Sequence, residues 1–450
     1  MTRLSDFIEI LKGYSSRRSI EYNGEIYTYF NLMEEVECWN DRFNQLDVQS
    51  GAVVGVRADY SVSSIAALIA LLLRRAVAAL VPRDRPFQRY VLDCHATALL
   101  DVRTDGSYDW QSTACETSHP LLDRMRAANE GGFVLFTSGS TGRPKAALQS
   151  TERFLYKFRK PGRCLSTLAF LLFDHIAGLD TVFYTLMSGG TLVLTRRRDP
   201  SSIAGLIESH RVEVLPTSPS FLRLLCMRTN CLTHDLSSLK VITYGSEPMD
   251  PATLAKLNIL FPYVQITQKY GTTETGSPRS ISRGDESLWL KFQSDGIETK
   301  VVDDVLWIRG ESTLLGYLNA PSPVDEDGWY CTSDLVDVDG PWIRFRGRAS
   351  DTINVGGEKV APAEVEHCIL ELDFVREAVV CGAPHSMLGQ IVTARVTLAD
   401  PDLDHKAASA SIWQHCRKGL AHYKAPVKVE IVDGGLTDDR QKVSRKRDVS

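Results

Sequence analysis

Apolar residues in the first part of the chain alternate between helical spacing and short buried runs. Four segments carry apolar residues at the ~3.6-residue period of a helix, namely residues 32–46, 64–74, 203–209 and 220–227. Four short apolar runs have the length of buried strands, namely residues 52–56, 78–81, 212–215 and 241–244. Strands that alternate with helices predict parallel sheets whose faces are covered by the helices.

The pattern changes near residue 300. Short strand-like segments at 299–302, 305–309 and 342–346 are separated by turns of aspartate and glycine, which predicts a small antiparallel sheet or barrel. A compact α+β pattern follows, with helices at 363–371 and 407–420 and strands at 375–381, 391–397 and 427–432.

We therefore expect two domains, residues 1–347 and residues 348–450. The predicted fold class is α/β. A large N-terminal domain should contain two helix-covered, mainly parallel sheets and a small β-barrel, and a small mobile α+β domain should follow it.

The bulk properties narrow the class of protein. The chain has 450 residues, 43% of them apolar and 24% charged, which is ordinary for globular proteins and too long for one core. A formal net charge of −5 disfavours binding to nucleic acid or to an anionic membrane. The apolar run at residues 65–73 is far shorter than the ~20 residues of a membrane-spanning helix. We expect a buried helix there and no stable membrane insertion.

The cysteines and the first residues of the chain bear on its compartment. Ten cysteines are scattered without a CxxC pair, so neither a zinc site nor a disulfide framework is expected. The first residues lack the basic, apolar and small-residue zones of a secretory signal. We therefore predict a cytoplasmic protein with no nucleic-acid partner.

The clearest chemical signal is the segment FVLFTSGSTGRPKAAL at residues 133–148. Glycines let backbone N–H groups approach an anion, hydroxyls add donors and a lysine adds positive charge, as a polyphosphate requires. The segment is not a Walker A loop, because Ala146 stands where serine or threonine would follow the lysine. A plain surface turn is the alternative. The predicted phosphate-binding residues are Thr137, Ser138, Gly139, Ser140, Thr141, Gly142 and Lys145.

This segment resembles the phosphate loop of the adenylate-forming superfamily, which includes acyl-CoA synthetases, nonribosomal-peptide adenylation domains and luciferases. Other segments similar to family motifs follow in the family's order: YGSEP at 244–248, QKYGTTETG at 268–276, GWYCTSD at 328–334, RFRGRASD at 344–351, VGGEKVAPAEVE at 355–366 and HYKAPVKVEIVD at 422–433. The pattern is most similar to acyl- or aryl-acid ligases. It is specific for adenylation and does not identify the acid.

The resemblance implies a nucleotide site. Tyr270 is expected beside adenine, Thr273 at the α-phosphate and Glu274 on Mg²⁺, for which a carboxylate is a preferred ligand. Asp334 and Arg348 are expected at the ribose hydroxyls. Solvated loop charges are the alternative for Glu274, Asp334 and Arg348. The other predicted nucleotide-site residues are Gly245, Ser246, Glu247 and Gly271.

Selection of the acid is expected to depend on residues 171–186, LLFDHIAGLDTVFYTL. His175 resembles the histidine that flanks the carboxylate in acyl- and aryl-CoA ligases. Asp174 and Asp180 do not align cleanly with the aspartate of amino-acid-activating relatives, so we expect an acid without an α-amino group. A plain amphipathic helix with a satisfied histidine accounts for the segment about as well. The other predicted acid-binding residues are Tyr244 and Gly271.

The last residues resemble the family's catalytic-lysine segment, which implies that Lys442 bridges the carboxylate and the α-phosphate. Gln441 replaces the family's glycine, so Lys446 is a rival and a solvated basic tail is another alternative. Domain rotation about a hinge at Ser350 is also implied. The predicted catalytic residues are Lys442, Lys145, Glu274 and Thr137, and those of the thiol tunnel are Gly356 and Gly357.

We therefore expect ATP-dependent activation of a carboxylic acid to an acyl-AMP and transfer of the acyl group to a thiol. The thiol would be CoA or the phosphopantetheine of a carrier protein. Positioning and charge neutralisation should supply most of the rate. An amine acceptor and a catalytically silent nucleotide-binding module are the alternatives. The expected cofactors are ATP and Mg²⁺, and the expected partners are a small carboxylic acid and, for the second thiol, an acyl carrier protein.

Overall fold

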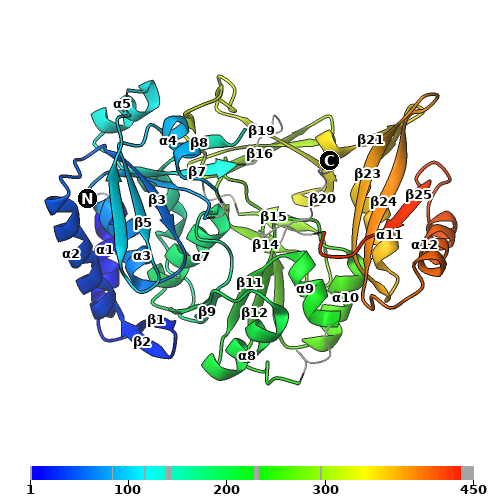
Figure 1. Cartoon of the computed structure of the whole chain (residues 1–450), viewed down its shortest axis with the longest axis horizontal. Helices are drawn as coiled ribbons and strands as arrows, with labels where there is room; N and C mark the ends of the chain where they lie inside the picture. Colours follow the sequence, from blue (N-terminus) through cyan, green and yellow to red (C-terminus); the bar gives the residue numbers. More distant parts are fainter. Residues whose placement is uncertain are drawn as a thin grey trace.

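Four β-sheets build the chain (Figure 1). The computed structural model describes residues 3–83, 85–115, 118–137, 143–227, 233–293 and 296–436. Three sheets and their helices form a large N-terminal domain, and the fourth forms a smaller C-terminal domain. The predicted α/β fold class with one large and one small domain is confirmed.

The first sheet has the order β13-β12-β11-β9-β10-β1-β2 and is parallel except where β2 returns along β1. Its strands are β1 (Arg18–Tyr22), β2 (Glu25–Thr28), β9 (Ser166–Ala169), β10 (Thr191–Leu194), β11 (Val214–Thr217), β12 (Val241–Tyr244) and β13 (Gln265–Gln268). Its helices are α7 (Ile176–Met187), α8 (Pro200–His210), α9 (Pro219–Met227) and α10 (Pro251–Leu260). Three of these helices start at a proline, whose missing N–H would be unpaired at a helix start in any case.

The second sheet has the order β18-β8-β7-β4-β3-β5-β6, with a parallel centre and antiparallel edges. Its strands are β3 (Val53–Ala58), β4 (Val77–Leu80), β5 (Ala98–Val102), β6 (Tyr108–Ser112), β7 (Gly132–Thr137), β8 (Lys145–Ser150) and β18 (Gly316–Tyr317). The helices nearby are α1 (Arg3–Tyr14), α2 (Tyr29–Gln45), α3 (Val62–Leu73), α4 (Gln88–Cys94), α5 (Pro120–Ala127), α6 (Thr151–Leu155) and the 3₁₀ turn Tyr156–Phe158. One apolar core joins this sheet to the first through α1, α2, α3 and α7.

The third sheet is antiparallel, in the order β14-β15-β20-β19-β17-β16. Its strands are β14 (Ser280–Ser282), β15 (Leu290–Phe292), β16 (Ile297–Val302), β17 (Val305–Gly310), β19 (Tyr330–Asp339) and β20 (Trp342–Arg348). Within the described ranges no pairing joins the end strands, so of the predicted sheet or barrel this element is an open sheet. Closure requires strands staggered around a filled interior, whereas this core has only four buried apolar residues, Leu306, Ile308, Val336 and Ile343.

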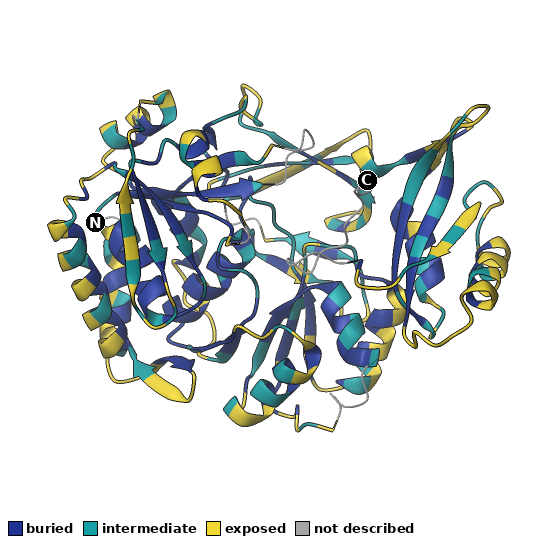
Figure 2. Ribbon diagram, viewed as in Figure 1, coloured by how far each residue is buried: buried dark blue, intermediate teal, exposed yellow. Residues whose placement is uncertain are grey.

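The fourth sheet is built on the long antiparallel hairpin of β23 and β24. Its strands are β21 (Ile353–Val355), β22 (Glu358–Val360), β23 (Val375–His385), β24 (Gly389–Leu398) and β25 (Lys428–Ile431). Two helices, α11 (Pro362–Leu370) and α12 (His405–Gly419), share its apolar core. Buried strands and exposed outer helix faces are visible in both domains (Figure 2).

The predicted helices and strands are present, with ends that differ by a few residues. The helix predicted from residue 32 begins earlier, at Tyr29, because Thr28 and Asn31 cap each other's backbone N–H groups. The predicted apolar helix is α3, which is buried along almost its whole length. In the described part of the chain no helix has the length and apolar character needed to cross a membrane.

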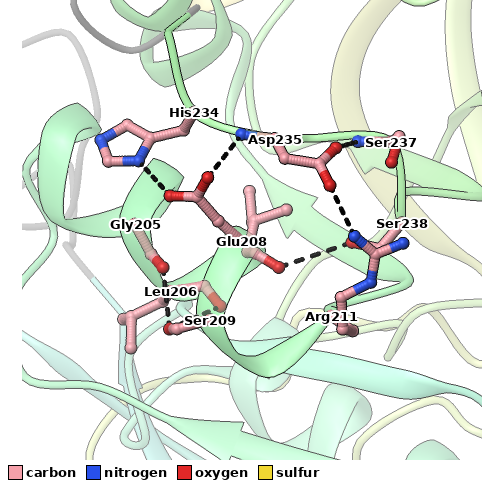
Figure 3. Close-up of polar contacts among 10 residues, drawn as sticks. Gly205, Leu206, Glu208, Ser209, Arg211, His234, Asp235, Ser237 and Ser238 are labelled. Atoms are coloured by element: carbon pink, nitrogen blue, oxygen red, sulfur yellow. Dashed lines mark hydrogen bonds and ion pairs between the residues drawn. The ribbon is translucent and has the colours of Figure 1, made fainter.

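The connection from α8 to β12 is held by charged groups (Figure 3). The carboxylate of Glu208, on α8, lies 2.7 Å from Nδ1 of His234 and accepts a hydrogen bond of 3.0 Å from the N–H of Asp235. Asp235 in turn accepts a hydrogen bond of 2.7 Å from Arg211. Ser238 donates to the carbonyl of Val212 (2.8 Å). These contacts fix the start of β12, whose other end carries the candidate site.

One arginine joins the two domains. Nη2 of Arg223, on α9, donates to the carbonyl oxygens of Leu370 (2.6 Å) and Val375 (3.0 Å), and its Nε donates to that of Arg376 (3.3 Å). Its Nη1 lies 3.7 Å from the carboxylate of Asp250. The contacts hold the end of α11 and the start of β23 against the N-terminal domain.

Candidate active site

The carboxyl ends of the parallel strands β12 and β13 lie side by side and carry two of the predicted motifs. Their last residues, Tyr244 and Gln268, are paired in the sheet. A Cβ atom at Gly245 would lie 2.6 Å from the carbonyl oxygen of Lys269, so the two loops touch through their backbones. The next residue, Ser246, has a left-handed φ of 72°. Ligand sites of open parallel sheets form at this edge.

Four side chains from the β13 loop and the third sheet form one cluster. The hydroxyl of Tyr270 donates to Oδ2 of Asp334 (2.6 Å), and Nε of Arg348 donates to Oδ1 of the same carboxylate (3.2 Å). The tyrosine ring stacks on Phe345 with 4.5 Å between ring centroids and 7° between planes. Asp334 and Arg348 are paired across β19 and β20. The predicted adenine residue and both predicted ribose residues therefore lie together.

Burial governs the titration of this cluster. Asp334 is 8% exposed, and burial raises the pKa of its carboxyl group while the charge of Arg348 lowers it in part. Burial and the carboxylate of Asp334 raise the pKa of Tyr270 well above its ordinary value. Tyr270 therefore remains a neutral hydrogen-bond donor at physiological pH.

Glu274 lies beside the hairpin that holds the predicted phosphate loop. The hydroxyl of Tyr317 donates to its Oε1 (2.6 Å). Nζ of Lys145 lies 5.1 Å from the centroid of the same tyrosine ring. Thr137 and Lys145 are paired at the open end of β7 and β8, and the predicted residues 138–142 lie outside the described residues. The predicted metal ligand and the predicted phosphate-binding lysine thus share Tyr317 as a neighbour.

The side-chain amides of Gln149 and Asn319 form hydrogen bonds that hold the predicted motifs in place. Nε2 of Gln149, on β8, donates to the carbonyl oxygen of Thr273 (2.6 Å). Asn319 accepts from the N–H of Ala146 (2.8 Å) and donates to the carbonyl of Pro144 (2.9 Å). The segment after β13 and the hairpin of β7 and β8 are therefore held in a fixed relation.

A cleft of about 350 Å³ lies between the two domains. One wall of the cleft contains predicted nucleotide-site residues, namely Ser246, Glu247, Tyr270, Gly271, Asp334 and Arg348. The opposite wall consists of residues of α11 and the start of β23, among them Glu366 and His367. The cleft offers a nucleotide a surface on each domain.

The helix predicted to select the acid is linked to the β13 loop. His175 is the half-buried N-cap residue of α7. Asp180, one turn further, forms an ion pair with Lys157, which also donates to the carbonyl of Ser277 (2.9 Å). A Cβ atom at Gly271 would lie 2.8 Å from Cα of Ser277. Lys157 therefore joins α7 to the wall that contains the predicted acid residue Gly271.

Several predicted residues lie away from the cleft or outside the described ranges. Ser350 is exposed in the 3₁₀ turn Ala349–Asp351, where its hydroxyl donates to Asp351 (3.1 Å). Gly356 and Gly357 form an exposed turn before β22 and do not line the cleft in this arrangement. Lys442 and Lys446 lie outside the described residues.

Several residues of the site were not predicted from the sequence. Phe345 lies within the matched segment RFRGRASD, but only the sheet register shows that its ring faces Tyr270. Tyr317 belongs to a two-residue strand and to no motif. Lys157 lies in the 3₁₀ turn after α6, within a stretch of aromatic and basic residues that matches no motif. Long-range packing, which local patterns do not encode, brings these side chains to the site.

Two family models match most of the chain. The family model for "AMP-binding enzyme" matches residues 9–318, and that for "AMP-binding enzyme C-terminal domain" matches residues 364–440. The chain is 27% identical to the 2-succinylbenzoate–CoA ligase of Bacillus pumilus, over 96% of this chain and 94% of that protein. It is 28% identical to the 3-[(3aS,4S,7aS)-7a-methyl-1,5-dioxo-octahydro-1H-inden-4-yl]propanoyl:CoA ligase of Rhodococcus jostii, over 74% of this chain and 68% of that protein.

A solved structure shares the fold. The anthranilate CoA ligase AuaEII, in complex with anthranoyl-AMP, superposes with a TM-score of 0.83 at 19% identity, over 98% of this chain and 95% of that one. The first family model covers more than half of the chain. The chain therefore belongs to the AMP-binding enzyme family.

Proposed function

We propose that the chain is an AMP-forming acid–thiol ligase. It joins a carboxylic acid to AMP with release of pyrophosphate and then passes the acyl group to a thiol, for which CoA is the proposed acceptor. The observation that carries the proposal is the cluster of Tyr270, Asp334 and Arg348 in the interdomain cleft. Family membership and the two relatives named as CoA ligases support it.

At the nucleoside end, the adenine would lie beside Tyr270, whose ring Phe345 holds in place by stacking. Asp334 would accept hydrogen bonds from the two ribose hydroxyls, because a carboxylate has only acceptors and the hydroxyls are donors. Arg348 would keep the carboxylate ionised through its hydrogen bond to Oδ1. These roles require no movement of β19 or β20.

At the phosphate end, Lys145 and the loop from Thr137 to Gly142 would bind the phosphates that leave. Glu274 fits a magnesium ligand, because it offers a buried carboxylate oxygen next to the phosphate-loop hairpin. Mg²⁺ held there would offset negative charge on the phosphates. Tyr317 would orient the carboxylate through its hydrogen bond to Oε1.

The chemistry has two displacement steps. In the first, a carboxylate oxygen attacks the α-phosphorus, the new P–O bond forms and the bond to pyrophosphate breaks. We assign Lys442 to neutralise the carboxylate and the α-phosphate during this step. In the second, the thiol sulfur attacks the acyl carbon, loses its proton, and AMP leaves with the electron pair of the broken C–O bond.

The acid has no α-amino group in this proposal. In amino-acid-activating relatives an aspartate near α7 pairs with the substrate ammonium, as the family resemblance implies. Here Asp180 already forms an ion pair with Lys157 of the chain itself. Its charge is therefore satisfied without a cationic substrate.

Several further assignments stay proposals. The domain boundary is placed at residues 347 and 348, with Ser350 as the hinge of a rotating C-terminal domain. Rotation would bring Gly356 and Gly357 from their exposed turn to the thiol tunnel. The cytoplasmic location, and a carrier protein as the alternative thiol partner, are also retained as predictions.

Exchange of labelled pyrophosphate into ATP tests the proposal. The protein should catalyse exchange only when Mg²⁺ and a suitable aryl or aliphatic acid are present, and adding CoA should yield the thioester. Absence of exchange over a broad acid panel would favour a catalytically silent nucleotide-binding protein instead. If an amide forms with an added amine and no thioester forms with CoA, the acceptor is an amine.

The lysine assignment has its own test. Lys442→Ala should lower adenylate formation by at least about 100-fold, because it removes a charge that interacts with the reacting groups. It should leave thioester formation from supplied acyl-AMP nearly unchanged. Lys446→Ala is the matched control; the assignment moves to Lys446 if that variant shows the larger loss.

A further inference from the structure

The part of the site around the predicted acid-binding residues His175, Tyr244 and Gly271, here called the acid end, contains more positive than negative charge. Lys269 and Arg279 flank the segment from Gly271 to Ser277 in the sequence, and Lys157 donates to the carbonyl of Ser277 (2.9 Å) and forms an ion pair with Asp180. Glu311 lines the same small cavity as Lys157 and Arg279 but forms no ion pair with either within the described ranges. Of these three cations, Lys157 alone forms an ion pair with a carboxylate in the described part of the chain.

Lys269 is the member of this group that lines the interdomain cleft. Its side chain has no hydrogen bond and no ion pair with any described residue, although six carboxylate groups line the same cleft: Glu247, Asp250, Asp334, Asp351, Glu366 and Glu377. Burial and the charge of Arg279 lower the pKa of Lys269 below its ordinary value. An enclosed ammonium without a counter-ion is costly for a protein to maintain. A ligand with negative charge would remove that cost.

The neighbours of Lys269 place this ligand at the acid end. The backbone N–H of Lys269 donates to the carbonyl of Tyr244 (2.7 Å), which is a predicted acid-binding residue. Burial lowers the pKa of Lys157, and the like charges of Lys269 and Arg279 lower it further. Lys157 contacts Asp180 on α7, the helix predicted to select the acid. Lys145, assigned to the phosphates, instead lies against Tyr317. Lys269 therefore belongs with the acid-binding residues.

We propose that the substrate carries a second carboxylate beyond the one that is activated, and that the ammonium of Lys269 binds it. The inference rests on the proposed function and adds the class of substrate, a dicarboxylic acid activated at one end. Asp180 keeps Lys157 paired, so Lys269 is the cation left for the substrate. Arg279, whose Nη2 donates to the carbonyl of Lys160 (2.8 Å), adds positive potential behind it.

The test compares each dicarboxylic acid with its own monomethyl ester, which has nearly the same length and lacks one charge. Aliphatic diacids of three to eight carbons and aromatic diacids form the panel, and pyrophosphate exchange gives kcat/KM. We expect at least one diacid to be preferred over its ester by about 10- to 100-fold, the range for a hydrogen bond between charged groups.

Lys269→Met should reduce that preference to less than about threefold, through a higher KM for the diacid, while the KM for ATP stays unchanged. Lys269→Arg keeps the charge and should retain the preference. Lys256→Met, which removes an exposed lysine of α10, is the matched control and should behave like the parent. Thermal unfolding of each variant checks that the fold is intact.

The outcomes separate this inference from the proposed function. Exchange with monocarboxylates and no preference for any diacid would overturn the inference and leave the ligase intact. A Lys269→Met variant whose KM for ATP rises with every acid would overturn it too, because the ammonium would then serve the phosphates. Absence of exchange with every acid would refute the proposed function and the inference with it.

Discussion

The two ends of the candidate site differ in how their charges are balanced. At the nucleoside end, Asp334 accepts hydrogen bonds from Tyr270 and Arg348, and each charged group has a partner within the chain. At the acid end, Lys269 lines the cleft with no ion pair among the described residues. The first end is organised before any ligand arrives, whereas the second is completed by one. The difference separates what every reaction of the site shares from what selects one acid.

Among the substitutions that test this comparison, Asp334→Ala should cause the largest loss of activity. Loss of the carboxylate removes both proposed ribose contacts and should lower kcat/KM for ATP by about 100-fold. The loss should be the same for every acid, because the nucleoside end does not contact the acid. Steady-state kinetics with two acids of different length measure it. Unequal losses for the two acids would contradict a division into independent ends.

The phosphate end should show an intermediate effect. Glu274→Gln keeps the size of the side chain and removes its charge, so kcat/KM for ATP should fall by about tenfold and the Mg²⁺ concentration for half-maximal activity should rise. Tyr317→Phe should cause a smaller change in the same direction, because it removes only the hydroxyl that donates to Oε1. Titration of Mg²⁺ at fixed ATP gives both values. Identical magnesium curves for Glu274→Gln and the parent would remove Glu274 as a ligand.

The smallest expected effect is on the pH dependence of adenosine binding. Burial raises the pKa of Asp334 above the ordinary aspartate value of 3.8, so on acidification it should take up a proton, and lose ribose binding, at a higher pH than an exposed aspartate. Arg348→Met removes a charge that lowers this pKa. The fall in adenosine affinity at acidic pH, the acidic limb of the profile, should therefore move further toward neutral pH. The expected change is about threefold in adenosine affinity at pH 5.

Adenosine suits this measurement because it has no phosphate group that titrates in the same range. Calorimetric titration between pH 4.5 and 8 should show the limb in the parent and in Arg348→Met. Asp334→Asn cannot ionise and should lack it. An unchanged limb in Arg348→Met would show that the arginine does not act on this carboxyl group.

Much of the fold was predictable from sequence because local patterns determine it. The run of α3 and the strands β4 and β12 were found within a few residues by apolar periodicity alone. Three strands of the third sheet, β16, β17 and β20, were predicted, whereas β14, β15 and β19 were not. Whether its edges meet depends on contacts distant in sequence, so the sequence left a sheet and a barrel open as alternatives. Element ends also shifted where side-chain caps, such as Thr28 with Asn31, extend a helix.

The candidate site was predictable only where motifs mark it. Tyr270, Asp334 and Arg348 come from three separate matched segments, and the structure brings them together. The assignments of Lys442 and of residues 138–142 stay predictions, because these residues lie outside the described ranges. Lys157 lies in no matched segment, and Lys269 lies in one, QKYGTTETG, but was given no role there. Their importance follows from which charges pair after folding, and a linear sequence does not contain that information.

The backbone contact between Gly245 and Lys269 has a consequence for how such enzymes diverge. Lys269 and Tyr270 are adjacent in the chain but are assigned to opposite ends of the site. The close approach at Gly245 fixes the path of this segment, so an inserted or deleted residue would disturb both ends at once. A point substitution at position 269 instead changes one side chain and leaves its neighbour in place. New substrate preferences can therefore evolve here by single replacements while the residues proposed to bind ATP stay unchanged.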